Sequence, residues 1–582
     1  MTPEERSLPD NALDSLAWAR CFEDERAVEL VWTATARAAA STPSAAVPGG
    51  GGHGAGADPA EGAGKDRGVR KLAHRIVICR RVHELGRTRA SFRRLARHPL
   101  PPQAPPLPLL LPLLLLAVAP PPPAAAVGVN WGFAASHPLP AAQVVRDLLL
   151  PNSVPRVRLS AASPDALAAL AGTGVAVTVG VPNELLRPLA ASRKAAAAWV
   201  HDNVTRYAPG VLFEYIAVGD DPFLLNHGQQ FQPFVVRAAA NIQQALDDAK
   251  LSSKMKVVVP CSSDAYQNAS TLPSKAYFRP DVNKTMAELL TFLANHSSPF
   301  MIELNPILSF RQKKNISLDY YLFQLMSRPL NDGLNKYDNY FDASIDAVVT
   351  ALTKASFSNM SIMVGRAGWP TDGAVNATPA IAQSFMTGLV NHLARKSGTP
   401  LRPKFVPTET YLYSLLDEDQ QSTASGSYER HYGVFTFDGQ AKYHVNLGQG
   451  PKALKNAVDV DYLPSKWCVL DDNKDLSNVS SSFSAACSNA DCTALSPGGS
   501  CTSIGWPGNV SFAFNSYYQQ HDQSGESCSF NGLGLITTVD PSVDNCLFAL
   551  AIRASASTSL HPTFSMLWIL ALGFFHLQFS LM

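Results

Sequence analysis

The segment VAVTVGVP at residues 175–182 is an apolar run without a charged residue. A continuous apolar strand of this kind is typical of a parallel sheet that is covered on both faces. Comparable runs recur along the chain on either side of it, and stretches with helical periodicity lie between them. The other strand-like runs are VGVNWG (127–132), RVRLS (156–160), FEYIAVGD (213–220), KVVVPCS (256–262), FMIELNP (300–306), SIMVGRAGWP (361–370) and ETYLYSLLD (409–417).

Helical patterns separate these strands, at Ser192–Asn203, Val235–Lys250, Asn339–Ala355 and Ala380–Arg395 among others. Eight strand–helix units in about 320 residues predict an α/β fold of the (β/α)8 TIM barrel type, over 127–450. A doubly wound open sheet would alternate in the same way. That fold would be expected to carry a nucleotide fingerprint, and no GxGxxG follows the first strand.

The balance of charged residues excludes one class of binding partner. The chain has 582 residues, with 48 Lys plus Arg against 47 Asp plus Glu, and hence a net charge of +1. A nucleic-acid-binding protein would need a large basic excess, so nucleic acid is not expected as a partner. We also expect no cofactor, no resident metal and a monomer.

The first 126 residues fall into two parts. Residues 1–100, rich in Ala, Gly and Arg, are interpreted as a disordered basic leader or a wrongly extended gene model; the alternative is a cytosolic tail on a membrane-anchored protein. Residues 101–126 hold the run LPLLLPLLLLAVAP (107–120), which is shorter than the roughly 20 apolar residues of a membrane-spanning helix. A basic flank, this short run and a small-residue exit predict a secretory signal cleaved near Ala126.

The C-terminal region 554–582 begins with small residues and ends in the apolar tail FSMLWILALGFFHLQFSLM (564–582). This order resembles a glycosylphosphatidylinositol (GPI) attachment signal, with Ser555 as the attachment site. The alternative is an ordinary membrane helix, but no basic cluster follows the tail. We therefore expect a secreted protein of the cell wall, anchored by lipid at the outer face of the plasma membrane.

Sequons and cysteines fit an oxidising compartment. Nine sequons are present, at Asn203, Asn268, Asn283, Asn295, Asn315, Asn359, Asn376, Asn478 and Asn509. Six of the nine Cys cluster in a predicted small module at 466–549, and spacing alone leaves 15 disulfide pairings. A zinc site is the alternative, weakened by the lack of any CxxC pair. Cys261, alone in the large domain, is expected to be a buried free thiol.

Polar and aromatic residues stand where the predicted strands end, and in a barrel these ends hold the chemistry. Aromatic faces and hydrogen-bonding side chains suit a sugar ring, which has apolar CH faces and a rim of hydroxyls. Any single member could instead cap or pack, but the group favours a site. Its members are Asn130, Trp131, Asp220, Asp221, Glu303, Asn305, Arg366, Trp369, Glu409, Asp417 and Glu418.

Several of these stretches resemble plant glycoside hydrolase family 17, the endo-1,3-beta-glucanases. The matching stretches are VGVNWG (127–132), VGVPNELL (179–186), YIAVGDDPF (215–223), YFDASIDAV (340–348), GWPTDG (368–373), ETYLYSLLDED (409–419) and ERHYGVF (429–435). The resemblance implies a (β/α)8 barrel that hydrolyses beta-1,3-glucan such as callose with retention of configuration.

The C-terminal module is similar to plant carbohydrate-binding module family 43, which binds beta-1,3-glucan. The similarity rests on WCV (467–469), PGGSC (497–501), FAFNSYYQ (512–519), TTVDPS (537–542) and the spacing of the cysteines. It implies pairing of Cys468 with Cys528, Cys487 with Cys492, and Cys501 with Cys546. Trp467, Tyr517 and Tyr518 are candidates for stacking on sugar, although Trp467 could equally pack in a small core.

The catalytic pattern of the family is broken twice. Retaining glycosidases need two carboxyl groups about 5–5.5 Å apart, one to donate a proton and one to attack the anomeric carbon. The family acid is the Glu of an Asn-Glu pair, and here the pair is Asp220-Asp221, so Asp221 holds the acid position. The family nucleophile precedes Ser/Thr-Gly-Trp-Pro, and here Arg366 stands in that place without a lone pair for attack.

Two expectations follow for the altered site. We expect Arg366 to form an ion pair with Asp220 or Asp221 that holds the cleft without turnover. Glu303 is a possible substitute carboxylate, but nothing in the sequence places it near the anomeric carbon.

The residues therefore favour a glucan-binding protein with impaired hydrolysis, a pseudoenzyme, over an active beta-1,3-glucanase or transglycosylase that uses other carboxylates. A membrane-tethered scaffold without a sugar ligand is the third possibility, and the aromatic strand ends argue against it.

Overall fold

The computed structural model describes residues 127–267, 272–313, 315–324, 329–405 and 409–553. The leader, the signal-like run, the C-terminal tail with Ser555, and the sequon at Asn268 lie outside the described residues. Within the described part of the chain, no helix combines the length and the apolar character needed to cross a membrane.

All eight predicted strands form, and together they make one parallel sheet. Its members are β1 (Gly128–Trp131), β2 (Arg156–Leu159), β3 (Ala176–Val181), β4 (Leu212–Val218), β5 (Lys256–Val258), β6 (Pro260–Ser262), β9 (Phe300–Glu303), β12 (Ile362–Ala367) and β13 (Thr410–Leu412). The predicted fifth strand is thus two short strands, because the nitrogen of Pro260 cannot donate a ladder hydrogen bond.

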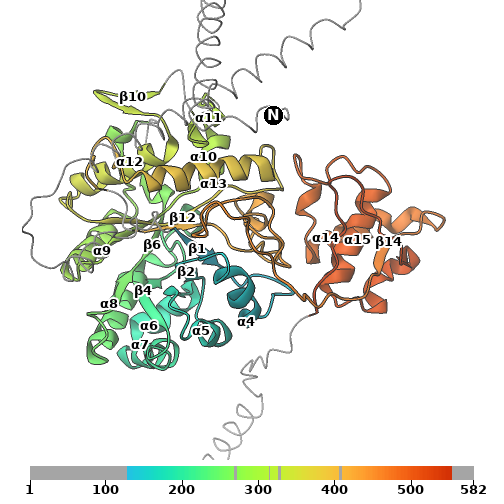
Figure 1. Ribbon diagram of the computed structural model, residues 1–582, viewed down its shortest axis with the longest axis horizontal. Helices are drawn as coiled ribbons and strands as arrows, with labels where there is room; N and C mark the ends of the chain where they lie inside the picture. Colours follow the sequence, from blue (N-terminus) through green and yellow to red (C-terminus); the bar gives the residue numbers. More distant parts are fainter. Residues whose placement is uncertain (1–126, 268–271, 314, 325–328, 406–408, 554–582) are drawn as a thin grey trace, which may run out of the picture. The chain divides into compact units, whose positions relative to one another are not determined.

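The sheet closes on itself. Its order is β5-β4-β3-β2-β1-β13-β12-β9-β6, and the two outermost strands, β5 and β6, are separated in the chain by Val259 alone. The order of the strands never reverses, as it would in a doubly wound sheet. Figure 1 shows these strands gathered at the centre of the larger body. The TIM-barrel prediction is therefore confirmed.

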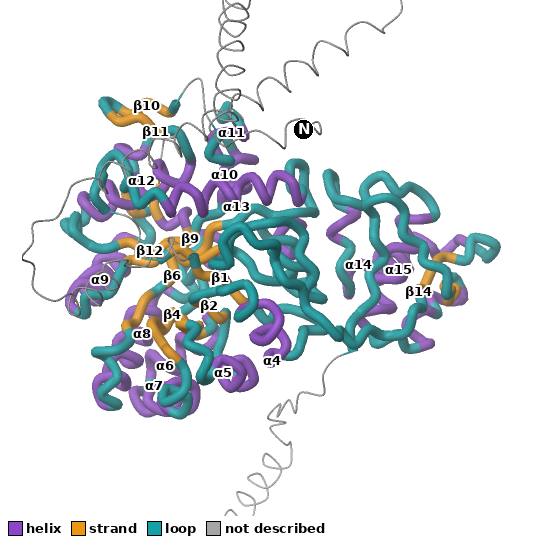
Figure 2. The backbone as a smooth tube through the Cα atoms, viewed as in Figure 1, coloured by secondary structure: helices purple, strands orange, loops and turns teal. Residues whose placement is uncertain are grey.

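Helices surround the sheet (Figure 2). The four predicted helical stretches correspond to α7 (Arg193–Val200), α8 (Gln232–Asp248), α12 (Tyr340–Lys354) and α13 (Pro379–Ala394), which are joined by α4 (Ala141–Gln143), α5 (Pro164–Leu170), α6 (Leu186–Ala191), α9 (Asn283–Asn295), α10 (Pro306–Gln312) and α11 (Leu318–Tyr321). Side-chain caps set several starts: Asn339 Oδ1 accepts the amide of Asp342 at 2.8 Å. Two short hairpins, β7–β8 (Tyr266–Gln267, Tyr277–Phe278) and β10–β11 (Leu330–Asp332, Asn335–Tyr337), decorate the barrel.

The core lies between the sheet and these helices. Strand residues such as Val129, Val157 and Val177 are fully or almost fully buried there. A separate cluster takes one residue from each of five barrel strands, namely Ala217, Val258, Met301, Met363 and Tyr411. Burial on both faces explains why the strands are apolar runs instead of alternating patterns.

The C-terminal module is held by disulfides. Antiparallel strands β14 (Trp467–Leu470) and β15 (Gly534–Thr537) pack with helices α14 (Val479–Asn489) and α15 (Gly508–Gln520). The bonds join Cys468 to Cys528, Cys487 to Cys492 and Cys501 to Cys546, so the pairing implied by the resemblance is confirmed. In the barrel Cys261 is free and buried, as expected.

Candidate active site

The ends of three barrel strands bring the predicted catalytic positions together. β4 leads into Asp220 and Asp221, β9 ends at Glu303, and β12 carries Arg366. Glu303 is the register partner of Arg366 across the β9–β12 pair. Because the strands run parallel, the structure places all four residues at the carboxyl end of the barrel, where barrel enzymes hold their active sites.

Arg366 has a partner that the sequence did not indicate. One of its terminal nitrogens donates to Glu429 Oε2 at 2.6 Å, and the Glu429 side chain is only 7% exposed. The expected ion pair with Asp220 or Asp221 is therefore wrong. The reason is distance: Glu429, on a segment that follows β13, lies closer to the guanidinium than either aspartate does.

Two tyrosines flank the same guanidinium. The central carbon of Arg366 lies 3.7 Å from the ring centroid of Tyr413 and 5.4 Å from that of Tyr432. Burial by itself would lower the pKa of Arg366, but Tyr413 and Glu429 raise it well above the usual value. The side chain consequently stays cationic and covers the face of Tyr413, where it gains a cation–π contact.

A second arginine, Arg158 on β2, neutralises the other side of the site. Its guanidinium is ion-paired with Glu303 and lies 3.9 Å from Asp220. It also donates to Gly365 O at 3.0 Å. The Arg158 and Glu303 side chains are both nearly buried, whereas 72% of the Asp220 side chain is exposed. Glu303 is thus committed to a buried charge pair.

Asp221 is the carboxyl group best suited to donate a proton. Its φ is 47°, a left-handed backbone conformation that residues other than Gly seldom adopt. Its Oδ1 atom is buried and has no hydrogen-bond partner. Burial raises the pKa of Asp221 well above its usual value, and the carboxylates of Glu303 and Asp220 add to the rise. The raised pKa favours the protonated form of Asp221, which is the form that a general acid needs.

Glu418 is a further buried carboxyl group at this end of the barrel, just beyond β13. It accepts the amide of Ala134 at 2.9 Å and is 6% exposed. Burial raises the pKa of Glu418 to about 7, with Asp220 and Asp417 adding to the rise. The Ala134 amide and Arg366 oppose it. Glu418 accordingly titrates near neutral pH.

Four predicted sugar contacts in the barrel serve structural roles instead. Asn130 donates to Gly365 O at 3.0 Å and to Leu412 O at 3.1 Å, which fixes it between strands. Asn305 caps α10 by accepting the amide of Leu308 at 3.1 Å. Trp131 and Trp369 are 4% and 0% exposed, so neither indole offers a face to a ligand.

Comparisons with known proteins identify the family of the chain. Residues 127–447 match Glycosyl hydrolases family 17, and residues 466–535 match the X8 domain. The chain belongs to glycosyl hydrolase family 17. A relative from Arabidopsis thaliana, "Glucan endo-1,3-beta-glucosidase 9", is 53% identical over 452 residues, which cover 77% of this chain and 94% of the relative. "Glucan endo-1,3-beta-glucosidase 5" from the same plant is 42% identical and covers 75% and 91%.

Solved structures place the family 17 barrel in the same fold. The beta-1,3-glucanase and allergen CJP38 of Cryptomeria japonica pollen superposes with a TM-score of 0.53 at 34% identity. The alignment covers 56% of this chain and 99% of that structure. A plant beta-glucan endohydrolase gives a TM-score of 0.51 at 33% identity over 55% and 100% of the two chains.

The X8 module carries a pocket of about 460 Å³. Tyr517 lines it, half-buried, and its ring stacks on His521 with centroids 3.9 Å apart. Trp467 and Tyr518 do not share this role, because they are 6% and 1% exposed in the core of the module. The indole of Trp467 donates to Phe548 O at 2.9 Å. Of the three predicted stacking residues, only Tyr517 lines this pocket.

Three groups of the family 17 site escaped the sequence reasoning: Arg158, Glu429 and the tyrosine pair Tyr413 and Tyr432. Arg158 left a signal, because an arginine inside the apolar run RVRLS has to find a charge inside the barrel. Glu429 stands in ERHYGVF, a stretch that was matched to the family without a role for its acid. The two tyrosines left no distinct signal among the other aromatic residues.

Proposed function

We propose that this family 17 protein binds beta-1,3-glucan in the barrel cleft and hydrolyses it weakly or not at all. The observation that carries the proposal is the place of Arg366. It stands at the position that the family resemblance assigns to the nucleophile, and its guanidinium is held there by Glu429 at 2.6 Å.

The chemistry of that position explains the expected loss of turnover. A guanidinium has no lone pair with which to attack an anomeric carbon. Its positive charge also opposes the oxocarbenium-like transition state, which needs negative charge beside it. Glu429 neutralises the guanidinium but is committed to that contact.

A competent hydrolase that uses other carboxylates is the second candidate, and one observation favours it. The Glu303 carboxylate is one cause of the raised pKa of Asp221, so these two carboxyl groups lie within electrostatic range of each other. Against it, Glu303 is buried and paired with Arg158. An attacking carboxylate would have to leave that pair.

For the X8 module we propose a second contact with beta-1,3-glucan, at the pocket beside Tyr517. The family similarity supports glucan as the ligand, and the pocket supplies an aromatic ring with hydroxyl, amide and carboxylate groups around it. These lining groups include Ser481, Asn489, Glu526 and Asn531. An aromatic face bordered by hydrogen-bonding groups suits a sugar ring.

We also propose that the protein acts outside the cell, anchored by lipid at the plasma membrane. The signal-like run at 107–120, the C-terminal tail at 564–582 and the sequons support this location. The three disulfides support it as well, since such bonds persist in oxidising compartments.

Incubation with laminarin tests the enzymatic part. The unmodified protein is expected to bind laminarin and to release little reducing sugar. The double variant Arg366→Glu/Asp221→Glu should gain at least about 100-fold in rate, since misplacement of a reacting group by about 1 Å can itself cost that much.

The matched control for this assay is Arg366→Gln/Asp221→Asn, which changes the same two positions without providing a nucleophile or a general acid. It should stay inactive. Release of reducing sugar by the unmodified protein at the rate of ordinary beta-1,3-glucanases would overturn the proposal in favour of the second candidate. In that case Glu303→Gln should abolish the activity.

A further inference from the structure

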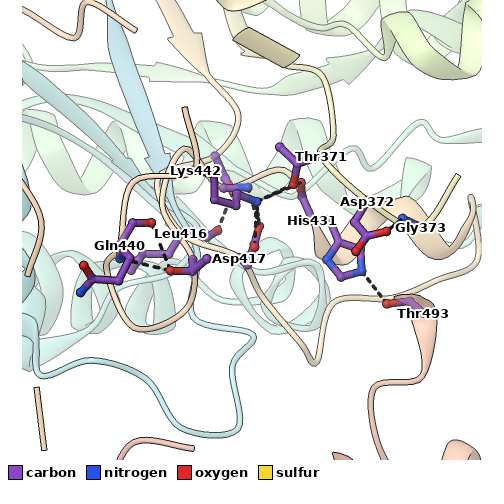
Figure 3. A network of polar contacts seen from close by, with 12 residues as sticks. Thr371, Asp372, Gly373, Leu416, Asp417, His431, Gln440, Lys442 and Thr493 are labelled. Atoms are coloured by element: carbon purple, nitrogen blue, oxygen red, sulfur yellow. Dashed lines mark hydrogen bonds and ion pairs between the residues drawn. The ribbon is translucent and has the colours of Figure 1, made fainter. Parts of the chain in front are cut away.

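A buried amine, Lys442, lies in the polar network that Figure 3 draws. Its Nζ donates to both carboxylate oxygens of Asp417, at 2.6 and 2.7 Å, and to Thr371 Oγ1 at 2.7 Å. A longer contact of 3.4 Å reaches the carbonyl oxygen of His431. Lys442 and Asp417 are 10% and 17% exposed, so this charge pair is largely withdrawn from water.

Each partner of Lys442 belongs to a segment that carries a cleft residue. Thr371 follows Arg366 on the segment after β12, Asp417 immediately precedes Glu418 on the segment after β13, and His431 stands two residues after Glu429. One amine therefore ties the three segments that present the arginine and the two buried glutamates.

Backbone hydrogen bonds join these segments directly. The amide of Thr371 donates to His431 O at 2.9 Å, and the amide of Glu418 donates to Arg430 O at 3.2 Å. On its other side, His431 Nε2 lies 2.6 Å from Thr493 Oγ1 (Figure 3). A shift of Asp417 would thus be passed to Glu418 and to the segment of Glu429.

We propose that Lys442 is a positioning residue for the candidate active site: it holds Asp417 and the segments around it. Its positive charge also offsets the effect of the neighbouring Asp417 carboxylate on Glu418. The proposal deepens the glucan-binding function proposed above. Only its relevance to glucan binding rests on that function. Lys442 acts through Asp417 and touches neither Arg366 nor Glu429 in the contacts described.

The electrostatic part follows from the groups that surround each member. Lys442 faces Asp417 and, farther away, Asp372; burial lowers its pKa and these two carboxylates raise it. Glu418 faces Asp417, Asp220 and Arg366, and the first two raise its pKa. Without the ammonium group, the full charge of Asp417 would act on Glu418. The ionised form of Glu418 would then become less favourable, so its pKa would rise above about 7.

The test is a carboxyl titration of Glu418 by NMR in the full chain, with 13C-labelled glutamate and with Glu418→Gln to assign the signal. Lys442→Met should raise the midpoint by at least about half a pH unit. Lys442→Arg keeps the charge and should leave the midpoint within experimental error. Asp417→Asn/Lys442→Met removes both charges and should bring the midpoint back to or below the original value.

The double variant separates positioning from a purely structural role. If Lys442 only filled space, both Met variants would disturb Glu418 alike and the midpoint would not return. An unchanged midpoint in Lys442→Met would overturn the proposal. If Lys442→Met does not fold, Asp417→Asn alone must lower the midpoint, and failure to do so would equally overturn it. The titration contains no glucan. A failure of the positioning proposal can therefore be distinguished from a failure of the glucan-binding proposal in the laminarin assay.

Discussion

At the scale of single residues, the ion pairs determine how the side chains of the candidate active site are arranged. Both substituted catalytic positions, Asp221 and Arg366, could be located from the sequence, because they stand inside matched motifs. The partner of Arg366 could not. Glu429 lies 63 residues farther along the chain, and only the folded barrel brings it within 2.6 Å. Motif spacing identifies positions, whereas ion pairing depends on distances in space.

The Arg366–Glu429 pair can be tested by removing one charge. Glu429→Gln should lower the free energy of unfolding by about 3 kcal/mol, because it leaves a largely buried guanidinium without its counter-charge. Urea unfolding measures the change. The double variant Arg366→Met/Glu429→Leu, which removes both charges, should cost clearly less than Glu429→Gln. Equal losses in the two variants would mean that the pair contributes packing and no electrostatic stabilisation.

Glu418 predicts a pH dependence of stability. Its pKa is about 7 in the folded protein, against an ordinary value of 4.5, so the folded state binds this proton more tightly than the unfolded state. The resulting stabilisation is fully present below about pH 4.5 and is lost as the pH rises through 7. The whole effect is on the order of 3 kcal/mol, at 1.36 kcal/mol per unit.

The corresponding variant is Glu418→Gln, which cannot ionise. Its free energy of unfolding relative to that of the unmodified protein should increase between pH 4.5 and pH 8, measured with urea at several pH values. The comparison cancels the contributions of all other groups that titrate in the same range. A difference that stays constant with pH would contradict the assignment of Glu418 as a buried acid titrating near neutrality.

At the scale of elements, the apolar runs predicted every barrel strand, because burial on both faces leaves a signal that needs no tertiary information. Pro260 marks the break between β5 and β6 in the sequence, whereas the sequence analysis predicts one continuous strand over 256–262. The roles of Trp131 and Trp369 were misassigned for a related reason. A strand end places a residue near the site, but it does not say whether the side chain points into the cleft or into the core.

The loop after β4 provides the prediction at this scale. Asn183 donates to Asp220 O at 2.6 Å and accepts the amide of Asp220 at 3.0 Å, so one side chain clasps the backbone beside Asp221. Asn183→Ala should speed amide hydrogen exchange in residues 219–223 and lower the free energy of unfolding by about 1–2 kcal/mol. The neighbouring exposed Glu184→Ala serves as the control and should change neither. Unaltered exchange in Asn183→Ala would show that other contacts hold Asp221.

At the scale of the whole molecule, two bodies of very different size are stabilised by different means. The barrel buries a large apolar core around its sheet, whereas the X8 module has only two small clusters, each of which contains disulfide cysteines. A small domain buries a smaller fraction of its surface on folding than a large one does, so cross-links contribute relatively more to its stability. The sequence predicted this division from the cysteine count, but the pairing came from the family resemblance, since spacing alone could not select it.

The loop lengths make the disulfides individually testable. Cys468 and Cys528 are 60 residues apart, and Cys487 and Cys492 only 5. If disulfides act by restricting the unfolded chain, loss of the first should destabilise the module by about 4 kcal/mol and loss of the second by about 2 kcal/mol. Calorimetry of the Cys468→Ala/Cys528→Ala and Cys487→Ala/Cys492→Ala variants compares them, and the unfolding of the barrel, whose Cys261 is a free thiol, should change little in either. Equal destabilisation by the two pairs would show that local packing around the sulfurs outweighs chain entropy, since only the packing term is independent of the length of the closed loop.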